Sequence, residues 1–180
     1  MLNNKKKILI LIFLLSFAIF IWTVNYIANN IIIIFEQNID NHLFIKTNGE
    51  IKVNDYVVYY IPGDPIIGNR KISHRVVCQG GQILKMVIDD YFCDGKYIGK
   101  AVRETKESIP VEPYNPCIAE EKRHSPFEFY RKDVVNTKIC KYKIPEGYYF
   151  VVGDHPRSYD PRYFGLISKK EIISKIEPLL

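Results

Sequence analysis

A loop near the C-terminal end of the chain carries its densest set of side chains able to do chemistry. Residues 148–165 read YYFVVGDHPRSYDPRYFG, and the apolar run ends at Gly153-Asp154. The loop that follows presents a hydroxyl, a carboxylate and a guanidinium at alternate positions, on Ser158, Asp160 and Arg162. A buried strand that ends in a Gly-Asp turn and continues as a polar loop can present functional side chains. The alternative is a solvated connection in which Asp160 and Arg162 form only a structural ion pair.

A histidine at the start of an apolar run is the second candidate. Segment 73–78 reads SHRVVC, so we expect His74 at the end of a strand and not on a solvated face. An imidazole titrates close to neutral pH and can act as a general base if a nucleophile and an orienting group meet it in space. A histidine that is simply hydrogen-bonded within the structure is the alternative. A further histidine, His42, either contacts lipid headgroups or is solvated.

The N-terminal residues that precede these groups predict a membrane anchor. Lysines at 5–7 come before an apolar stretch, Ile8–Ala28, and a helix of that length spans about 30 Å, the thickness of a bilayer core. The position of the lysines indicates that the N-terminus stays inside and the remainder lies outside. A cleavable signal peptide is the rival, but a second apolar run at 31–35 replaces the expected cleavage site. We therefore expect an uncleaved single-pass anchor in residues 1–30 and an exported domain in residues 31–180.

All four cysteines lie in the exported part, at Cys78, Cys93, Cys117 and Cys140. An even number there predicts one or two disulfides, with three possible pairings; four buried free thiols are the alternative. No CxxC spacing and no Cys/His cluster with zinc spacing occurs, so we expect no metal site and no cofactor. The net charge of +5 comes partly from the N-terminal lysines, and the cations form no stripe. That pattern argues against a nucleic-acid partner and favours an anionic membrane surface.

The exported part is predicted to be mainly β. Its short runs rich in Val, Ile and Tyr lie between Pro, Gly and Asn, at 55–61, 74–78, 82–88 and 148–153. Asp94-Gly95 is the strongest hairpin signal, because both turn residues must take positive φ, and Gly80-Gly81 predicts another turn. Residues 108–137 contain four prolines and many charges, and indicate an irregular insertion. The spacing Ser168-x-x-Glu171 is that of a capping box and predicts a short helix near the end.

These pieces and their order resemble the signal peptidase I superfamily. Its C-terminal box resembles the pattern Gly153-Asp154-x-x-x-Ser158-x-Asp160-x-Arg162-x-x-Gly165, and the ending Tyr163-Phe164-Gly165 is most similar to the conjugative-transfer (TraF-type) serine peptidase branch. Asn54-Asp55 resembles the family's Gly-Asp turn before a strand, with Asn54 in place of Gly. His74-Arg75-Val76 stands where the family has Lys-Arg-Val. The resemblance implies a signal-peptidase-like β-rich domain after a single N-terminal transmembrane helix.

The resemblance also implies an activity and a location. Such enzymes are serine endopeptidases that process leader peptides or pilin precursors in conjugative transfer or secretion. The implied partners are a membrane, an extended peptide or precursor protein, and the conjugation or secretion machinery. The implied location is the bacterial inner (cytoplasmic) membrane, with the domain on the periplasmic or outer side.

This chain departs from the family pattern at both reacting positions. The nucleophile position, aligned through His42-Leu43-Phe44, holds Asn38, and an amide is not a usable nucleophile. The base position holds His74. In this respect the segment resembles the endoplasmic-reticulum and archaeal branches of the superfamily, which have a His-Arg-Val segment and a Ser–His pair. Thr47 is a weak alternative nucleophile, one residue out of register with the Ser–His branch.

Two functional hypotheses follow from this mixture. In the first, His74 is the base of a peptidase, oriented by Asp154 or Asp160, and the resemblance makes Ser158 and Arg162 supporting residues as well. In the second, the chain is a catalytically inactive peptidase-fold protein that serves as a binding or assembly component of a conjugation or secretion apparatus. Its strand edges would then hold an extended peptide by β-augmentation, which needs only backbone groups.

Overall fold

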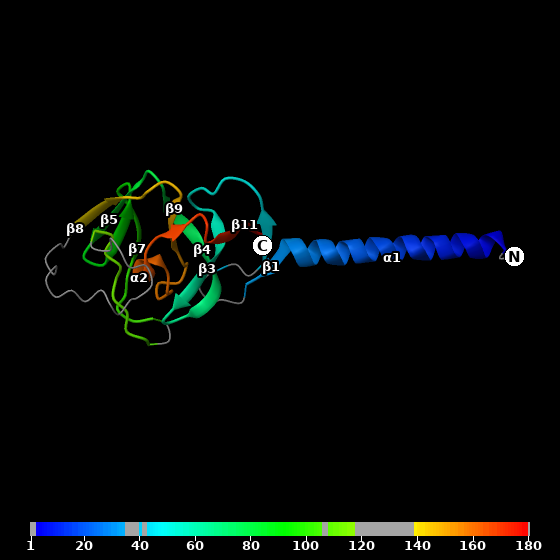
Figure 1. Cartoon of the computed structure of the whole chain (residues 1–180), viewed down its shortest axis with the longest axis horizontal. Helices are drawn as coiled ribbons and strands as arrows, with labels where there is room; N and C mark the ends of the chain where they lie inside the picture. The colour runs from blue at the N-terminus through cyan, green and yellow to red at the C-terminus, as the bar shows by residue number, and fades with distance from the viewer. Residues whose placement is uncertain (1–2, 35–39, 41–42, 106–107, 118–138, 180) are drawn as a thin grey trace.

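A computed structural model describes residues 3–34, 40, 43–105, 108–117 and 139–179. A long helix, α1 (Asn4–Asn30), projects from a β-rich body as a separate rod, with the N-terminus at its far end (Figure 1). Asn3 caps the N-terminus of the helix, and its side chain accepts a hydrogen bond from the Lys5 amide. None of its side chains is buried against the body, and the helix is long and apolar enough to cross a membrane. The apolar stretch therefore forms the predicted helix.

Two antiparallel sheets make up the body within the described residues. The larger sheet has the strand order β1-β2-β11-β3-β4-β9-β10, and the smaller has the order β7-β6-β5-β8. The strands are β1 (Ile31–Ile33), β2 (Leu43–Thr47), β3 (Tyr56–Asp64), β4 (Gly68–Gln79), β5 (Ile83–Val87), β6 (Asp90–Cys93), β7 (Lys96–Lys100), β8 (Ile139–Lys143), β9 (Tyr148–Val152), β10 (Ile167–Ser168) and β11 (Ile172–Pro178), with one short helix, α2 (Pro161–Phe164). The body is mainly β, as predicted, and the four predicted strands correspond to β3, β4, β5 and β9.

The hairpin of β3 and β4 forms the centre of the larger sheet. Its register places Val57 opposite His74 and Tyr59 opposite Ile72. His74 is therefore in the interior of β4, and the prediction that it stands at a strand end is wrong. The polar residues 68–73, which precede His74, are part of the same strand. Backbone pairing with β3 holds them in a strand in spite of their low β-propensity.

Turn residues behave as their chemistry predicts at the tip of the small sheet. Asp94 and Gly95 have φ of 46° and 84°, which are the positive values that the hairpin between β6 and β7 requires. Asn54, which the sequence resemblance expects in place of a Gly, also has a positive φ of 78°. Asn tolerates that conformation better than most residues, which explains how it replaces Gly there.

The predicted C-terminal helix is wrong. Ser168 and Glu171 do form the side-chain contacts of a capping box, with the Ser168 amide donating to Glu171 Oε2 at 2.7 Å. The chain then continues as β11 because this segment starts with the β-branched pair Ile172-Ile173 and lies between β2 and β3. Pairing on both edges satisfies its backbone groups, so the box closes a turn and starts no helix.

The core lies between the two sheets. Tyr91 of β6 and Phe150 of β9 are both fully buried and stack with their ring centroids 5.4 Å apart. The described part of the predicted insertion, residues 108–117, forms no named strand and makes one isolated bridge, Glu104 to Pro110. Residues 118–137 of that insertion lie outside the described residues.

Two disulfides resolve the three pairings that the sequence leaves open. Cys78 of β4 is bonded to Cys93 of β6, and Cys117 is bonded to Cys140 of β8. The first bridge joins the larger sheet directly to the smaller one. It lies four residues from His74 on the same strand, so it ties the strand of the candidate base to the second sheet.

Replacing Cys78 and Cys93 together with alanine is expected to lower the free energy of unfolding by about 3 kcal/mol, because the bridge closes a loop with a sequence separation of 15. Urea unfolding of the full chain in detergent, followed by the near-UV circular dichroism of its tyrosines, measures the change. The Cys117→Ala/Cys140→Ala variant is the matched control for a bridge that does not join β4 to β6. Amide hydrogen exchange in β4 and β6 should accelerate more in the Cys78/Cys93 variant than in the Cys117/Cys140 variant. Equal exchange rates in the two variants would contradict the link that the first bridge makes between β4 and β6.

Candidate active site

His74 lies at the centre of the candidate site and is completely buried. Its Nδ1 is 2.7 Å from the hydroxyl oxygen of Tyr59, and its Nε2 is 3.1 Å from Ser158 Oγ. Both ring nitrogens are therefore hydrogen-bonded to hydroxyls. This geometry gives the imidazole one fixed orientation.

The sheet register explains why these three residues meet. Tyr59 is two residues along β3 from Val57, the direct partner of His74, so Tyr59 and His74 are diagonal neighbours on one face of the hairpin. On the other side of β4, Arg75 pairs with Val152, the last residue of β9. The loop that follows Val152 consequently starts beside His74, which brings Ser158 to Nε2.

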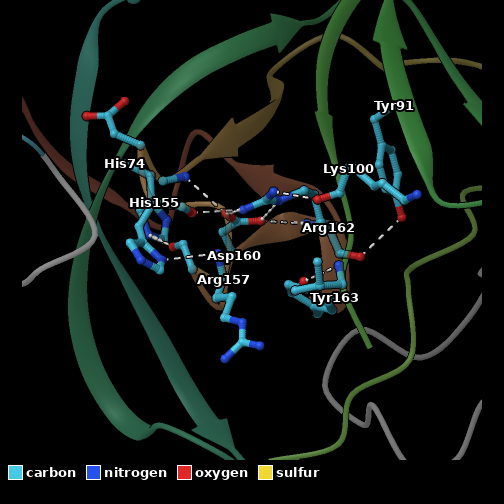
Figure 2. Close-up of polar contacts among 12 residues, drawn as sticks. His74, Tyr91, Lys100, His155, Arg157, Asp160, Arg162 and Tyr163 are labelled. Carbon is cyan, nitrogen blue, oxygen red and sulfur yellow. Dashed lines mark hydrogen bonds and ion pairs between the residues drawn. The ribbon is translucent and has the colours of Figure 1, made fainter. Parts of the chain in front are cut away.

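A buried ion pair between Asp160 and Arg162 holds that loop. Arg162 Nε and Nη2 donate to the two oxygens of Asp160 at 2.8 and 2.7 Å, and both side chains are almost fully buried. The Asp160 carboxylate also accepts from the Gly153 amide at 3.0 Å and caps α2 by accepting from the Arg162 amide at 3.1 Å. Arg162 Nη1 donates to the Lys100 carbonyl at 2.7 Å, so the pair joins the loop to β7, and Figure 2 shows Arg162 between Asp160 and Lys100.

Asp154, near the start of the same loop, makes a second set of contacts. Its carboxylate accepts hydrogen bonds from Arg75 Nε at 3.3 Å, the Tyr56 hydroxyl at 2.9 Å and the Asp40 amide at 3.4 Å. Burial and the bond to Asp154 raise the pKa of Tyr56 to about 12. Asp154 thus connects β3, β4 and Asp40.

The electrostatics of the site keep His74 uncharged. Burial lowers the pKa of His74 from 6.5 to about 4; the Asp160 carboxylate opposes that change, Arg162 reinforces it, and Asp154 also opposes it. At neutral pH the ring therefore carries one N–H and one lone pair. Among the described contacts of His74 there is no hydrogen bond to Asp154 or Asp160, so these carboxylates act on the ring only through their charge.

Thr47 is not brought to His74. Thr47, Lys175, Val57 and His74 are successive partners across β2, β11, β3 and β4. Three strand spacings of roughly 4.8 Å place Thr47 about 14 Å from His74 along the sheet. Its Oγ1 is buried and has no hydrogen-bond partner among the described residues. Asn38 and His42 lie outside the described residues, and Asp40 is the described residue closest in sequence to position 38.

Tyr59 is the site residue that the sequence reasoning missed. A signal for it is present, because YVVYY at 56–60 and ISHRVV at 72–77 form one hairpin in which a tyrosine and the histidine share a face. Finding it requires the register of the hairpin, and the sequence patterns fix the strands but not their alignment.

The sequence profile of the family described as "Signal peptidase, peptidase S26" matches residues 5–180, almost the whole chain. The chain belongs to this family. The match supports a signal peptidase I-type hydrolase, and the conjugative-transfer branch stays a prediction.

Individual S26 relatives are similar over parts of the chain. "Signal peptidase I V" of Bacillus subtilis is 31% identical over 109 residues, which are 60% of this chain and 56% of the relative. "Signal peptidase I" of Haemophilus influenzae is 38% identical over 63 residues, which are 34% of this chain and 18% of the relative. The chain therefore spans about half, or less, of the length of these curated relatives. A solved signal peptidase I from Enterococcus faecalis V583 matches with a TM-score of 0.40 and 19% identity, covering 73% of this chain and 100% of that chain.

The buried neutral His74 predicts a loss of stability in mild acid. Its pKa is about 4 in the folded protein and near 6.5 when unfolded, so the unfolded state binds more protons between these values. The free energy of unfolding should fall by roughly 3 kcal/mol from this group as the pH drops from 6.5 to 4. Urea unfolding at several pH values, compared between the wild type and His74→Gln, measures this contribution. Parallel pH profiles for the two proteins would contradict it.

Arg162→Met should destabilise the protein by about 3–5 kcal/mol, because it leaves the buried Asp160 carboxylate without its cation. Arg103→Met is the matched control, since Arg103 pairs with Asp89 and Glu112 but its side chain is 58% exposed. That exposed cluster should contribute less than about 1 kcal/mol. Thermal or urea unfolding of both variants distinguishes the two positions, and equal losses would refute the role given to the buried pair.

Proposed function

We propose that this chain is a membrane-anchored endopeptidase of the signal peptidase type that processes leader peptides or pilin precursors in conjugative transfer or secretion. One observation carries the proposal: Ser158 Oγ lies 3.1 Å from His74 Nε2 on a loop braced by the buried Asp160–Arg162 pair. A neutral histidine held in one orientation is the arrangement that a general base requires. Membership of the S26 family supports the same reaction class.

The lack of a suitable nucleophile should limit the rate of cleavage. Asn38 has no hydroxyl, and Thr47 is too far from His74 to lose a proton to it. Among the described residues, the hydroxyls in contact with the ring are those of Ser158 and Tyr59, and both residues are fully buried. Among the residues that the structure describes, an incoming carbonyl carbon therefore meets no exposed hydroxyl beside the base. Hydrolysis by the wild type would have to use a water molecule as the nucleophile, with His74 taking its proton, so we propose that it is slow.

The strand that carries His74 supports the choice of an extended peptide as substrate. β4 pairs with β3 between Arg70 and Arg75, whereas its pairing with β9 begins only at Arg75. Within the described part of the chain, the segment 70–74 thus has a strand partner on one edge only. An extended peptide added to the other edge would satisfy its backbone groups and run directly past His74.

The lysines at the start of α1 and the two disulfides support a location in the bacterial inner membrane. α1 begins beside three lysines, which favours a cytoplasmic N-terminus and a domain on the periplasmic or outer side of the bacterial inner membrane. The two disulfides agree with that side, because disulfides form and persist in oxidising compartments.

Cleavage tests the proposal with the full chain reconstituted in lipid vesicles and a leader-bearing pilin precursor as the substrate. Wild-type processing should be slow, and Asn38→Ser should raise its rate because it supplies a hydroxyl at the nucleophile position. Adding His74→Ala to Asn38→Ser should then reduce the rate about 10²- to 10⁴-fold, the usual contribution of a general base. In the same Asn38→Ser background, Ser158→Ala should also slow cleavage, because it removes the hydroxyl that contacts His74 Nε2. Ser168→Ala is its matched control, since the Ser168 hydroxyl bonds to Glu171 of its own turn. Equal processing with and without His74 would sink its role as the base.

A second function, peptide binding without cleavage, is favoured by a specific observation. Both nitrogens of His74 are already bonded to hydroxyls in the folded chain, and position 38 holds an amide. The wild type would then bind a leader peptide and leave it intact. A peptide with N-methylated alternate amides is the control, because it cannot pair with the edge of β4. Equal affinity for both peptides would exclude strand addition as the binding mode.

A further inference from the structure

His74 makes two hydrogen bonds to hydroxyls, and the donor in each bond decides where the ring proton lies. A neutral imidazole has one donor and one acceptor, so two arrangements satisfy both contacts. Either Tyr59 donates to Nδ1 and the Nε2–H donates to Ser158, or the Nδ1–H donates to Tyr59 and Ser158 donates to Nε2.

Acidity and proximity favour the first arrangement. A phenol O–H is a stronger acid than an alcohol O–H or the N–H of a neutral imidazole, so it is the best of these donors to an imidazole lone pair. Tyr59 Oη lies 2.7 Å from Nδ1, and Ser158 Oγ lies 3.1 Å from Nε2, so the phenol makes the closer contact. A close phenol and a more distant serine fit Tyr59 donating to Nδ1 and the Nε2–H donating to Ser158.

From this geometry we propose that Tyr59 is a positioning residue for His74: its hydroxyl donates to Nδ1 and places the ring proton on Nε2, where it points at Ser158. Tyr59 and His74 are both completely buried, so water does not compete for this bond. Their rings pack at a centroid distance of 5.8 Å with an interplanar angle of 50°, which holds the hydroxyl in the direction of the ring nitrogen.

The consequence concerns the proposed function, on which this step rests. With the proton on Nε2, the single lone pair of His74 is on Nδ1 and is occupied by Tyr59. His74 accepts a proton from a nucleophile only after the hydrogen bond to Tyr59 is exchanged or broken. Tyr59 thus sets both the resting tautomer and the cost of activating the base.

The tautomer is measurable whether or not the chain cleaves peptides. The full chain, labelled with ¹⁵N-histidine in detergent micelles, gives two-bond ¹H–¹⁵N correlations that distinguish Nε2–H from Nδ1–H. Four histidines are present, and the signals lost in His74→Gln assign His74. At neutral pH the wild type should show the Nε2–H form alone.

Tyr59→Phe keeps the ring and removes the donor, so the single tautomer of His74 should be lost in favour of a mixture. Tyr60→Phe is the matched control, because Tyr60 is the next residue of β3, lies on the opposite face and is 38% exposed. It should leave the His74 signals as in the wild type. A wild-type proton on Nδ1 would overturn the proposal, and so would an unchanged tautomer in Tyr59→Phe. If Tyr59→Phe does not fold, the spectrum of the wild type decides alone.

A kinetic comparison extends the test to the reaction. In the Asn38→Ser background, adding Tyr59→Phe should move the acidic limb of the pH profile of kcat/KM, whereas adding Tyr60→Phe should not. A purely structural role for Tyr59 would lower the rate at every pH without moving that limb, and would remove Tyr59 from the reaction. Absence of cleavage in the Asn38→Ser protein would count against the proposed peptidase function and would leave the NMR result on Tyr59 standing.

Discussion

The buried ion pair of Asp160 and Arg162 is the interaction on which the rest of the site depends. A carboxylate without exposure is tolerable only when a cation and further donors replace its water, and Asp160 has Arg162 and two backbone amides. Through these bonds the Asp160 side chain fixes the end of β9 and the start of α2, and Arg162 extends the link to β7 through the Lys100 carbonyl. Tyr91 adds to the same structure by donating to the Arg162 carbonyl at 3.1 Å. Ser158 reaches His74 because the loop around it is held at so many points.

The sequence identifies most of the fold because its local signals agree with one another. The strands, the Asp94-Gly95 hairpin and the apolar helix follow from side-chain type and turn chemistry, which act over a few residues. It fails where long-range pairing decides. Residues 172–178 become a strand because β2 and β3 lie on both sides of them, and the segment before His74 extends β4 because β3 pairs with it. The disulfide pairing also depends on contacts distant in sequence.

The residues of the candidate site also fall into two groups: those that a sequence motif shows, and one that only the pairing of strands brings in. The loop residues Ser158, Asp160 and Arg162 are visible in the sequence because they form one motif within five positions. Tyr59 is not, because its link to His74 depends on a register that no motif records. Family resemblance predicts the supporting groups and leaves the reaction open, since fold and family do not by themselves specify the chemistry of a site. His74 has both ring nitrogens hydrogen-bonded to hydroxyls, so the arrangement of protons around the ring is the decisive property of the site.

The bridge between Cys117 and Cys140 has a consequence for the integrity of the chain. It encloses a sequence separation of 23 and ends on β8, the edge strand of the smaller sheet. A single cut by a foreign protease anywhere inside that ring would leave both pieces joined through sulfur. β8 would keep its covalent tie to the part of the chain that bears His74, and the nick would appear on a gel only after a reducing agent was added.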